Sequence, residues 1–78
     1  MLKYKLVDDN SKTLVYHYFQ NGNEKPGRVK VDKTNGQIDV IEQSESDFRN
    51  RFAFKVVDRL EEFYQTGDYK SEGTIAWY

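Results

Sequence analysis

Few of the 78 residues have side chains that could carry catalysis, and these are not spaced for it. His17 is the single histidine and cysteine is absent, so thiol nucleophiles, thiolate metal sites and paired histidine ligands are excluded. The neighbouring acids Asp8 and Asp9, and likewise Glu61 and Glu62, point apart on a strand or a helix, so neither pair forms a two-carboxylate site. The sequence therefore predicts no enzyme activity, no cofactor and no metal.

Other catalytic patterns are missing as well. No serine or threonine follows the strand–turn–helix pattern of a nucleophile elbow, and no glycine-rich loop leads into a helix to hold a phosphate. The segment Asn21–Asn23 contains a glycine but precedes a predicted strand. His17 lies within a predicted strand, where a lone histidine is typical of a half-exposed structural residue rather than a catalytic base. We expect a domain that acts by contact, with no small-molecule substrate.

Composition limits the class of partner. Twelve basic and 13 acidic residues give a net charge of −1, so there is no bulk attraction to nucleic acid or to an anionic membrane. This balance conceals a division, because residues 1–33 carry 7 − 4 = +3 and residues 34–78 carry 5 − 9 = −4. Apolar runs reach only about four residues, against about 20 for a membrane span. With no apolar leader at the start, the sequence predicts a cytoplasmic protein.

Aromatic residues are the main resource for a core: one Trp, six Tyr and five Phe make 12 rings. A domain of this size buries only about 60% of its unfolded surface, and each aromatic ring can bury roughly 150–250 Å². Eight rings are predicted to form one sheet–helix core: Tyr4, Tyr16, Tyr18, Phe48, Phe52, Phe63, Tyr64 and Trp77. The other four rings lie outside this predicted core and could contact a partner: Phe19, Phe54, Tyr69 and Tyr78.

Alternating apolar and polar residues predict four β-strands. The strands are expected at residues Leu2–Leu6, Lys12–Gln20, Arg28–Asp32 and Gln37–Glu42. Turn-forming residues separate them, at Asp8–Ser11, at Asn21–Gly27 and at Asn35–Gly36, where both residues of an Asn-Gly pair accept positive φ. Three short connections in succession predict an antiparallel four-stranded meander.

The hydrophobic period then changes to that of a helix. Ser44 and Asp47 fit a capping box, and apolar residues recur at helical spacing from Phe48 to Tyr64, before a terminating Gly67. The predicted helix is about 20 residues long and covers one face of the sheet. Residues 74–78 are expected to form a short fifth strand or an extended cover. The fold class is thus α+β, with residues 1–78 as a single domain.

Two residues depart from the helical pattern. Arg49 lies at the centre of the apolar arc, where its guanidinium would have to reach past the sheet edge. Phe54 lies far from that arc, so we expect it to be exposed or to contact something outside the core.

The face of the sheet away from the helix is the candidate site. Alternation assigns it eleven residues: Lys3, Lys5, Val7, Val15, His17, Phe19, Arg28, Lys30, Gln37, Asp39 and Ile41. Such a face can be merely solvated, since lysine stems cover apolar surface and discourage edge aggregation. Alternatively, cations beside an aromatic ring can form a platform for single-stranded nucleic acid, although one ring is few for stacking. Its apolar members, together with Phe54, can also form a contact surface for another protein or for a second copy.

We therefore predict a non-enzymatic interaction module that binds protein, with nucleic-acid binding as the alternative. The candidate partner-binding residues are Lys3, Lys5, His17, Phe19, Arg28, Lys30 and Phe54.

Three segments of the chain are similar to those of a known family. They are Gly27–Asp32 with Asn35 and Gly36, Asp47 through Ala53, and the distinctive ending Glu72–Tyr78. In these segments the chain resembles a family of small uncharacterised proteins found in Gram-positive bacteria and in their phages and prophages. The resemblance implies no activity, cofactor or catalytic residue. It implies an accessory protein, of possible phage origin, that acts by contact.

Overall fold

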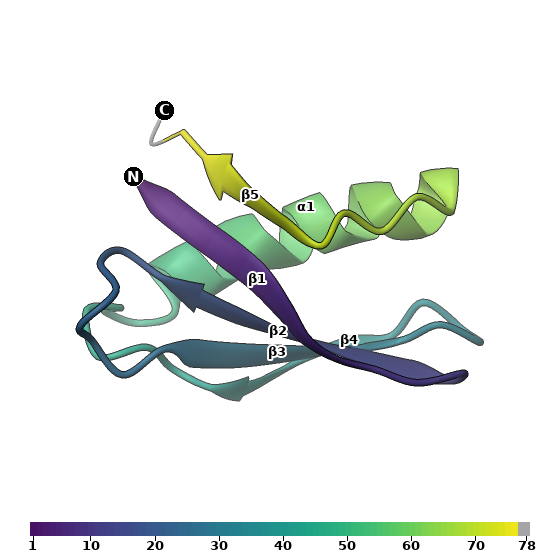
Figure 1. The fold of residues 1–78 in the computed structure, drawn as a ribbon, viewed down its shortest axis with the longest axis horizontal. Coiled ribbons are helices and arrows are strands. Elements are labelled where there is room, and N and C mark those ends of the chain that lie inside the picture. The colour runs from purple at the N-terminus through teal and green to yellow at the C-terminus, as the bar shows by residue number, and fades with distance from the viewer. Residues whose placement is uncertain (77–78) are drawn as a thin grey trace.

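The computed structural model describes residues 1–76, which form one five-stranded antiparallel sheet and one helix. The elements follow the chain as β1 (Leu2–Asp9), β2 (Thr13–Phe19), β3 (Gly27–Asp32), β4 (Ile38–Glu42), α1 (Arg51–Thr66) and β5 (Glu72–Ile75). In space the strand order is β4-β3-β2-β1-β5. The sheet is twisted, and α1 lies along one side of it (Figure 1). This arrangement confirms the predicted α+β class and the four-stranded meander with a C-terminal helix.

The segment after the helix does form a fifth strand. Leu2 lies opposite Ile75 and Lys5 opposite Glu72, so β5 adds to the free edge of β1. Figure 1 accordingly shows β5 beside β1. The first strand is longer than predicted, because Asp8 and Asp9 still belong to β1 and the turn begins only at Asn10. The side chain of Asn10 holds that turn by accepting hydrogen bonds from the amides of Lys12 and Thr13, both at 2.9 Å.

The core lies between the helix and the inner face of the sheet. The helix buries a stripe at helical spacing, namely Ala53, Val56, Leu60 and Phe63. The strands contribute Leu2, Tyr4, Leu14, Tyr16, Tyr18, Val29, Val31 and Ile75. Among the predicted core rings, Tyr4, Tyr16, Tyr18 and Phe63 are buried and Phe52 packs partly buried against them. The hydroxyl of Tyr16 donates to the carbonyl of Lys70 at 2.7 Å, which anchors the chain between α1 and β5.

Tyrosine rings cover glycines in this small core. Gly27 lies opposite Tyr18 across β2 and β3, and Gly73 lies opposite Tyr4 across β1 and β5. At both glycines a Cβ atom would overlap the facing tyrosine ring. An aromatic ring that covers a cross-strand glycine compensates for the glycine's missing side chain. The absence of a side chain at these two glycines therefore leaves the space that the tyrosine rings occupy.

The third hairpin differs in detail from the prediction. Gly36 has φ 77°, whereas Asn35 has a negative φ, so only one residue of the Asn-Gly pair is left-handed. The amide of Gly36 donates to the carbonyl of Asp32 at 2.8 Å, and the Asp32 amide donates to Gln37 at 2.8 Å. The loop comprises residues 33–36, as the predicted strand ends at Asp32 and Gln37 imply, with glycine at its last position.

The helix starts later than predicted, at Arg51, and the capping box at Ser44 is wrong. Asp47 supplies the cap in another way, because its buried carboxylate accepts the amides of Phe52 at 3.0 Å and Ala53 at 3.1 Å. The same carboxylate accepts the hydroxyl of Tyr18 at 2.7 Å. A contact to the sheet therefore determines where the helix begins. At the other end, Gly67 adopts φ 75° and its amide bonds Phe63, as predicted for a terminating glycine.

Three residues lie elsewhere than predicted, two of them, Phe48 and Arg49, because the helix starts later. Phe48 was predicted in the core but precedes the helix and is 64% exposed. Tyr64 is also exposed, and its ring covers Gly36 in the β3–β4 loop. Arg49 lies before the helix, with its guanidinium 5.1 Å from the centre of the Phe48 ring. The predictions for Trp77 and Tyr78 concern positions outside the described residues.

Within residues 1–76, no helix is both long enough and apolar enough to cross a membrane.

Candidate functional site

Six of the seven predicted site residues come together on the sheet face opposite α1, which we call the open sheet face. One row of the register runs through Lys5, His17 and Arg28 on β1, β2 and β3. Lys3 lies opposite Phe19, and Lys30 lies opposite Val15 on the same side. In the central strands the side chains alternate between the two faces as predicted, because a shift of the register by one residue would bury these charges.

The seventh residue lies elsewhere. Phe54 is on the outward side of α1, away from the buried stripe through Ala53 and Val56, and is 60% exposed. Its predicted exposure is confirmed. Because the helix covers the inner face of the sheet, Phe54 lies on the opposite side of the molecule from the open sheet face. The two surfaces therefore cannot form one continuous contact patch.

Acidic residues balance the cations of the open sheet face. Glu72 on β5 lies opposite Lys5, and Asp39 on β4 lies opposite Lys30. At the β4 edge, Glu42 pairs with both Arg28 at 3.7 Å and Lys25 at 3.1 Å. The hydrogen bond from Lys25, with the charges of Lys25 and Arg28, lowers the pKa of Glu42. Acids on the edge strands β4 and β5 thus flank the cations of β3 and β1, so the face is not uniformly basic.

Sequence reasoning missed two of these acids for identifiable reasons. Glu72 belongs to the fifth strand, which is far from β1 in the sequence, so local patterns do not show that the two strands pair. Glu42 reaches Arg28 because β4 has a bulge: Ile41 is an extra residue between the pairs Arg28–Glu42 and Val29–Val40. A second bulge makes Val7 the extra residue of β1. Bulges are not visible in the alternation of so short a strand.

Val15, also predicted on this face, is buried rather than exposed. It lies on the central strand between Asp8 and Lys30, so side chains from both neighbouring strands flank it. The apolar part of the open sheet face that solvent can reach is therefore smaller than alternation suggests.

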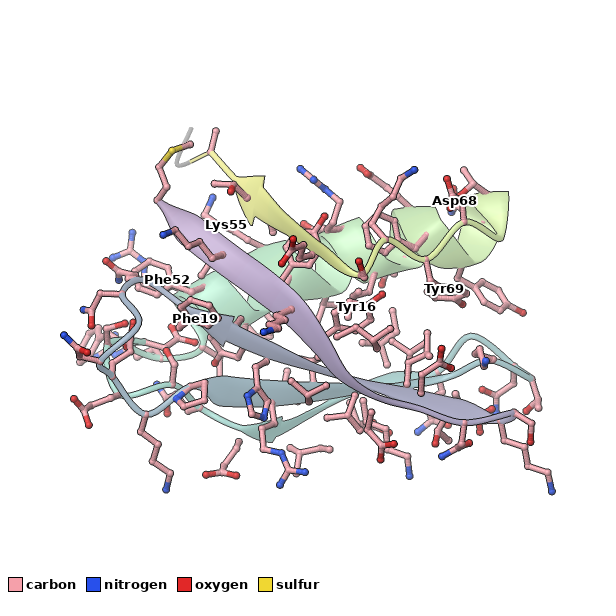
Figure 2. All side chains as sticks on the ribbon, viewed as in Figure 1. Tyr16, Phe19, Phe52, Lys55, Asp68 and Tyr69 are labelled. Atoms are coloured by element: carbon pink, nitrogen blue, oxygen red, sulfur yellow. The ribbon has the colours of Figure 1, made fainter. Side chains whose placement is uncertain are left out.

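Phe19 lies between two shallow hollows of the open sheet face. One hollow of about 280 Å³ is lined by Phe19 with Lys3, Lys5 and Thr74, among others. A second of about 130 Å³ is lined by Phe19 with His17 and residues of the β2–β3 loop, Gly22, Glu24 and Pro26. Figure 2 shows Phe19 where β2 ends, at the same end of the molecule as Phe52 at the start of α1. The half-buried ring of Phe19 is thus the shared wall of both hollows.

The β2–β3 loop beside the second hollow is held in place by Glu24. Its carboxylate accepts the amides of Gln20, of Asn21 at 3.0 Å and of Ser46 at 3.0 Å. Partial burial opposes ionisation of Glu24, but these hydrogen bonds outweigh it and lower its pKa. The loop is therefore tied to the segment that precedes α1.

His17 lies in the middle of the charged row and is half-buried. Burial lowers its pKa below the ordinary value of 6.5, and the charge of Arg28 lowers it further, while Glu42 acts in the opposite direction. The imidazole is therefore neutral at pH 7. Within residues 1–76, no group of three or more histidine or acidic side chains is placed to hold a metal ion.

This environment predicts how His17 titrates. Its folded pKa lies below that of the unfolded chain, so the unfolded state binds more protons between the two values. Stability is therefore expected to fall as the pH drops below about 6.5, and to be independent of this group above that pH. The chemical shift of the imidazole Cε1 proton against pH gives the pKa directly.

Two substitutions separate the effects of Arg28 and Glu42 on the pKa of His17. Arg28→Gln is expected to raise the pKa of His17 toward 6.5, and Glu42→Gln is expected to lower it further. A His17 pKa at or above 6.5 in the unchanged protein would contradict the geometry of this row.

Comparisons with known proteins return no match: no family model, no curated protein and no solved structure is similar to the chain at a significant level. The resemblance to a family of Gram-positive bacteria and phages therefore stays a prediction.

Proposed function

We propose that this protein is a non-enzymatic interaction module that binds another protein through its open sheet face. The proposal depends on one observation: the half-buried Phe19 ring stands between two hollows on a sheet face that the helix leaves uncovered. An aromatic anchor in a hollowed surface, surrounded by polar groups, is the usual composition of a protein-binding patch. His17 lies between Lys5 and Arg28 across the strands and between Val15 and Phe19 along β2, and none of these four is an acid that could orient the imidazole as a base.

The charges of the face favour protein over nucleic acid as the partner. A nucleic-acid platform needs cations whose charge is not already compensated. Arg28 forms an ion pair with Glu42 at 3.7 Å, and Lys5 and Lys30 lie opposite Glu72 and Asp39 on the edge strands, so acids offset part of the basic charge. Stacking of bases needs several rings, and among residues 1–76 Phe19 is the one Phe, Tyr or Trp of the open sheet face that lines either hollow. Basic strands between acidic edges instead suit a partner surface with its own pattern of charges.

Selection from a random-peptide display library tests this proposal with purified protein. Selected peptides are expected to lose at least tenfold in affinity, by calorimetry, with the variants Phe19→Ser and Lys3→Glu. The control Gln65→Ser, exposed on α1, should bind as the unchanged protein does. Peptides that bind all four proteins equally would place the partner elsewhere. Turnover of a substrate that depends on His17 would overturn the non-enzymatic assignment.

The partner can also be a second copy of the chain, and sedimentation velocity distinguishes this case. Self-association through the open sheet face predicts a sedimentation coefficient that rises with concentration and that Phe19→Ser returns to the monomer value. A monomer at all concentrations would remove the homodimer and leave another protein as the partner.

A further inference from the structure

A second surface, at the start of α1, combines exposed rings with cations for which the described residues form no ion pair. Phe48 and Phe54 are 64% and 60% exposed. Arg49 and Arg51 are exposed beside them, and Lys55 is half-buried. Arg51, Phe54 and Lys55 follow the spacing i, i+3, i+4, which places them together on one helical surface. We call these five residues the aromatic–basic patch.

The patch is continuous across the boundary between loop and helix. The amide of Arg51 donates to the carbonyl of Phe48 at 3.2 Å, so Phe48 lies one turn before the first helical residue. The guanidinium of Arg49 lies over the Phe48 ring. From residue 48 to residue 57 the chain has three cations and no acid. Among residues 1–76, no ion pair joins Arg49, Arg51 or Lys55 to an acidic side chain.

This order of charges is the reverse of what stabilises a helix. The N-terminal end of a helix favours acids and its C-terminal end favours bases. Here the first turn of α1 has no acid and the last turn has no base. The acids Asp58, Glu61 and Glu62 follow in the second half, and Figure 2 shows Lys55 along the first half, with Asp68 beyond the far end. Arg51 and Lys55, four residues apart, also repel each other. Helix stability does not account for this arrangement.

The backbone before the helix is strained in a way that exposes Phe48. Arg49 and Asn50 both have φ 58°, in the left-handed region that residues other than glycine seldom adopt. The two residues break the helical path, so Phe48 projects from the loop and does not extend the buried stripe. The helix amides of Phe52 and Ala53 are already taken by Asp47. Anything anionic at this end must therefore bind to the side chains of the patch.

We propose that the aromatic–basic patch binds single-stranded nucleic acid. Phosphates would pair with Arg49, Arg51 and Lys55, while unpaired bases would stack on the free ring surfaces of Phe48 and Phe54. The bases must be unpaired. In a duplex the neighbouring base pairs cover both faces of each base, so no face is open to a phenylalanine ring. A peptide of acidic residues alone would satisfy the cations but has no flat groups for two exposed rings, whereas every nucleotide has both a phosphate and a base. This surface is distinct from the open sheet face and does not depend on the function proposed for that face.

Fluorescence anisotropy with a labelled 12-nucleotide oligothymidylate tests the proposal. With about three phosphate contacts, the slope of log K against log salt is about −2, so a tenfold rise in salt weakens binding about 100-fold. Phe54→Ala is expected to weaken binding about tenfold through lost stacking. Arg51→Glu is expected to remove detectable binding. Lys12→Glu, in the exposed turn between β1 and β2 and outside both surfaces, serves as the matched charge-reversal control and leaves binding by the patch unchanged.

The sites of substitution are exposed, and circular dichroism verifies that each variant is folded. Three results would overturn the proposal. The first is no binding at about 20 mM salt, where the electrostatic contribution is strongest. The second is equal weakening by Arg51→Glu and Lys12→Glu. The third is competition by oligoglutamate as effective as by unlabelled oligonucleotide, with no effect of Phe54→Ala, which would assign the patch to acidic peptides.

Discussion

Replacing Asp47 with alanine is expected to lower the free energy of unfolding by about 2–4 kcal/mol, because one buried carboxylate serves three donors. The substitution removes the acceptor for the amides of Phe52 and Ala53, which begin the helix. It also leaves the buried hydroxyl of Tyr18, which donates to Asp47 at 2.7 Å, without that acceptor. Chemical denaturation followed by far-UV circular dichroism measures the loss.

Glu45→Ala is the matched control, since Glu45 is an exposed acid two residues earlier in the same segment. It changes the net charge equally and is expected to alter stability by less than about 0.5 kcal/mol. Tyr18→Phe removes the other partner and is expected to cost about 1–2 kcal/mol. The double variant Asp47→Ala with Tyr18→Phe should lose less than the sum of the two. If Asp47→Ala were no worse than Glu45→Ala, the carboxylate would not be what starts the helix.

Gly27→Ala is expected to destabilise the fold by about 1–3 kcal/mol through overpacking. A Cβ atom at Gly27 would overlap the ring of Tyr18 and lie 2.7 Å from the backbone nitrogen of Ser44. The Tyr18 ring cannot easily retreat, because its hydroxyl is held by Asp47 and accepts the Ser44 amide at 3.1 Å. Thermal and chemical denaturation of the purified variant give the change.

Gly22 offers an internal control for the same substitution. A Cβ atom there would meet nothing within 4 Å, and Gly22 does not have a positive φ. Gly22→Ala is therefore expected to change stability by less than about 0.5 kcal/mol. Equal effects at the two glycines would contradict the contact between Gly27 and Tyr18 as the cause of the loss.

Most of the fold could be predicted because hydrophobic period and turn residues agree along the chain. The strands follow from alternation, and Gly67 ends the helix as expected. The helix start could not be predicted, because Asp47 turns inward to meet Tyr18, a residue far away in the sequence. Local patterns favoured Ser44, and the error carried Phe48 into the predicted core. Tertiary contacts, not local propensity, decided this boundary.

In the candidate site, too, the residues that follow a local pattern could be predicted, and those that depend on tertiary contacts could not. Lys3, Lys5, His17 and Phe19 could be assigned to one face, because alternation in central strands is reliable when the other face is buried. Asp39 could be assigned in the same way, whereas Glu42 and Glu72 could not, because they depend on a bulge and on a strand added from a distant segment. Exposure of Phe54 could be predicted from its angle on the helix. Its grouping with Phe48 required the observed start of α1.

The pairing of β5 with β1 has a consequence for how the molecule opens and closes. The contacts among β1, β2, β3 and β4 join neighbouring segments, whereas the β1–β5 ladder closes a loop that includes nearly the whole described chain. Such closure carries the largest entropic penalty of any contact in the sheet. The four residues of β5 form only a short ladder to offset this penalty. We therefore expect β5 to detach from the sheet before the other strands unfold, and its amides to be the first of the sheet to exchange with solvent. Release of β5 would uncover the hydrogen-bonding edge of β1, including the backbone next to Lys3 and Lys5.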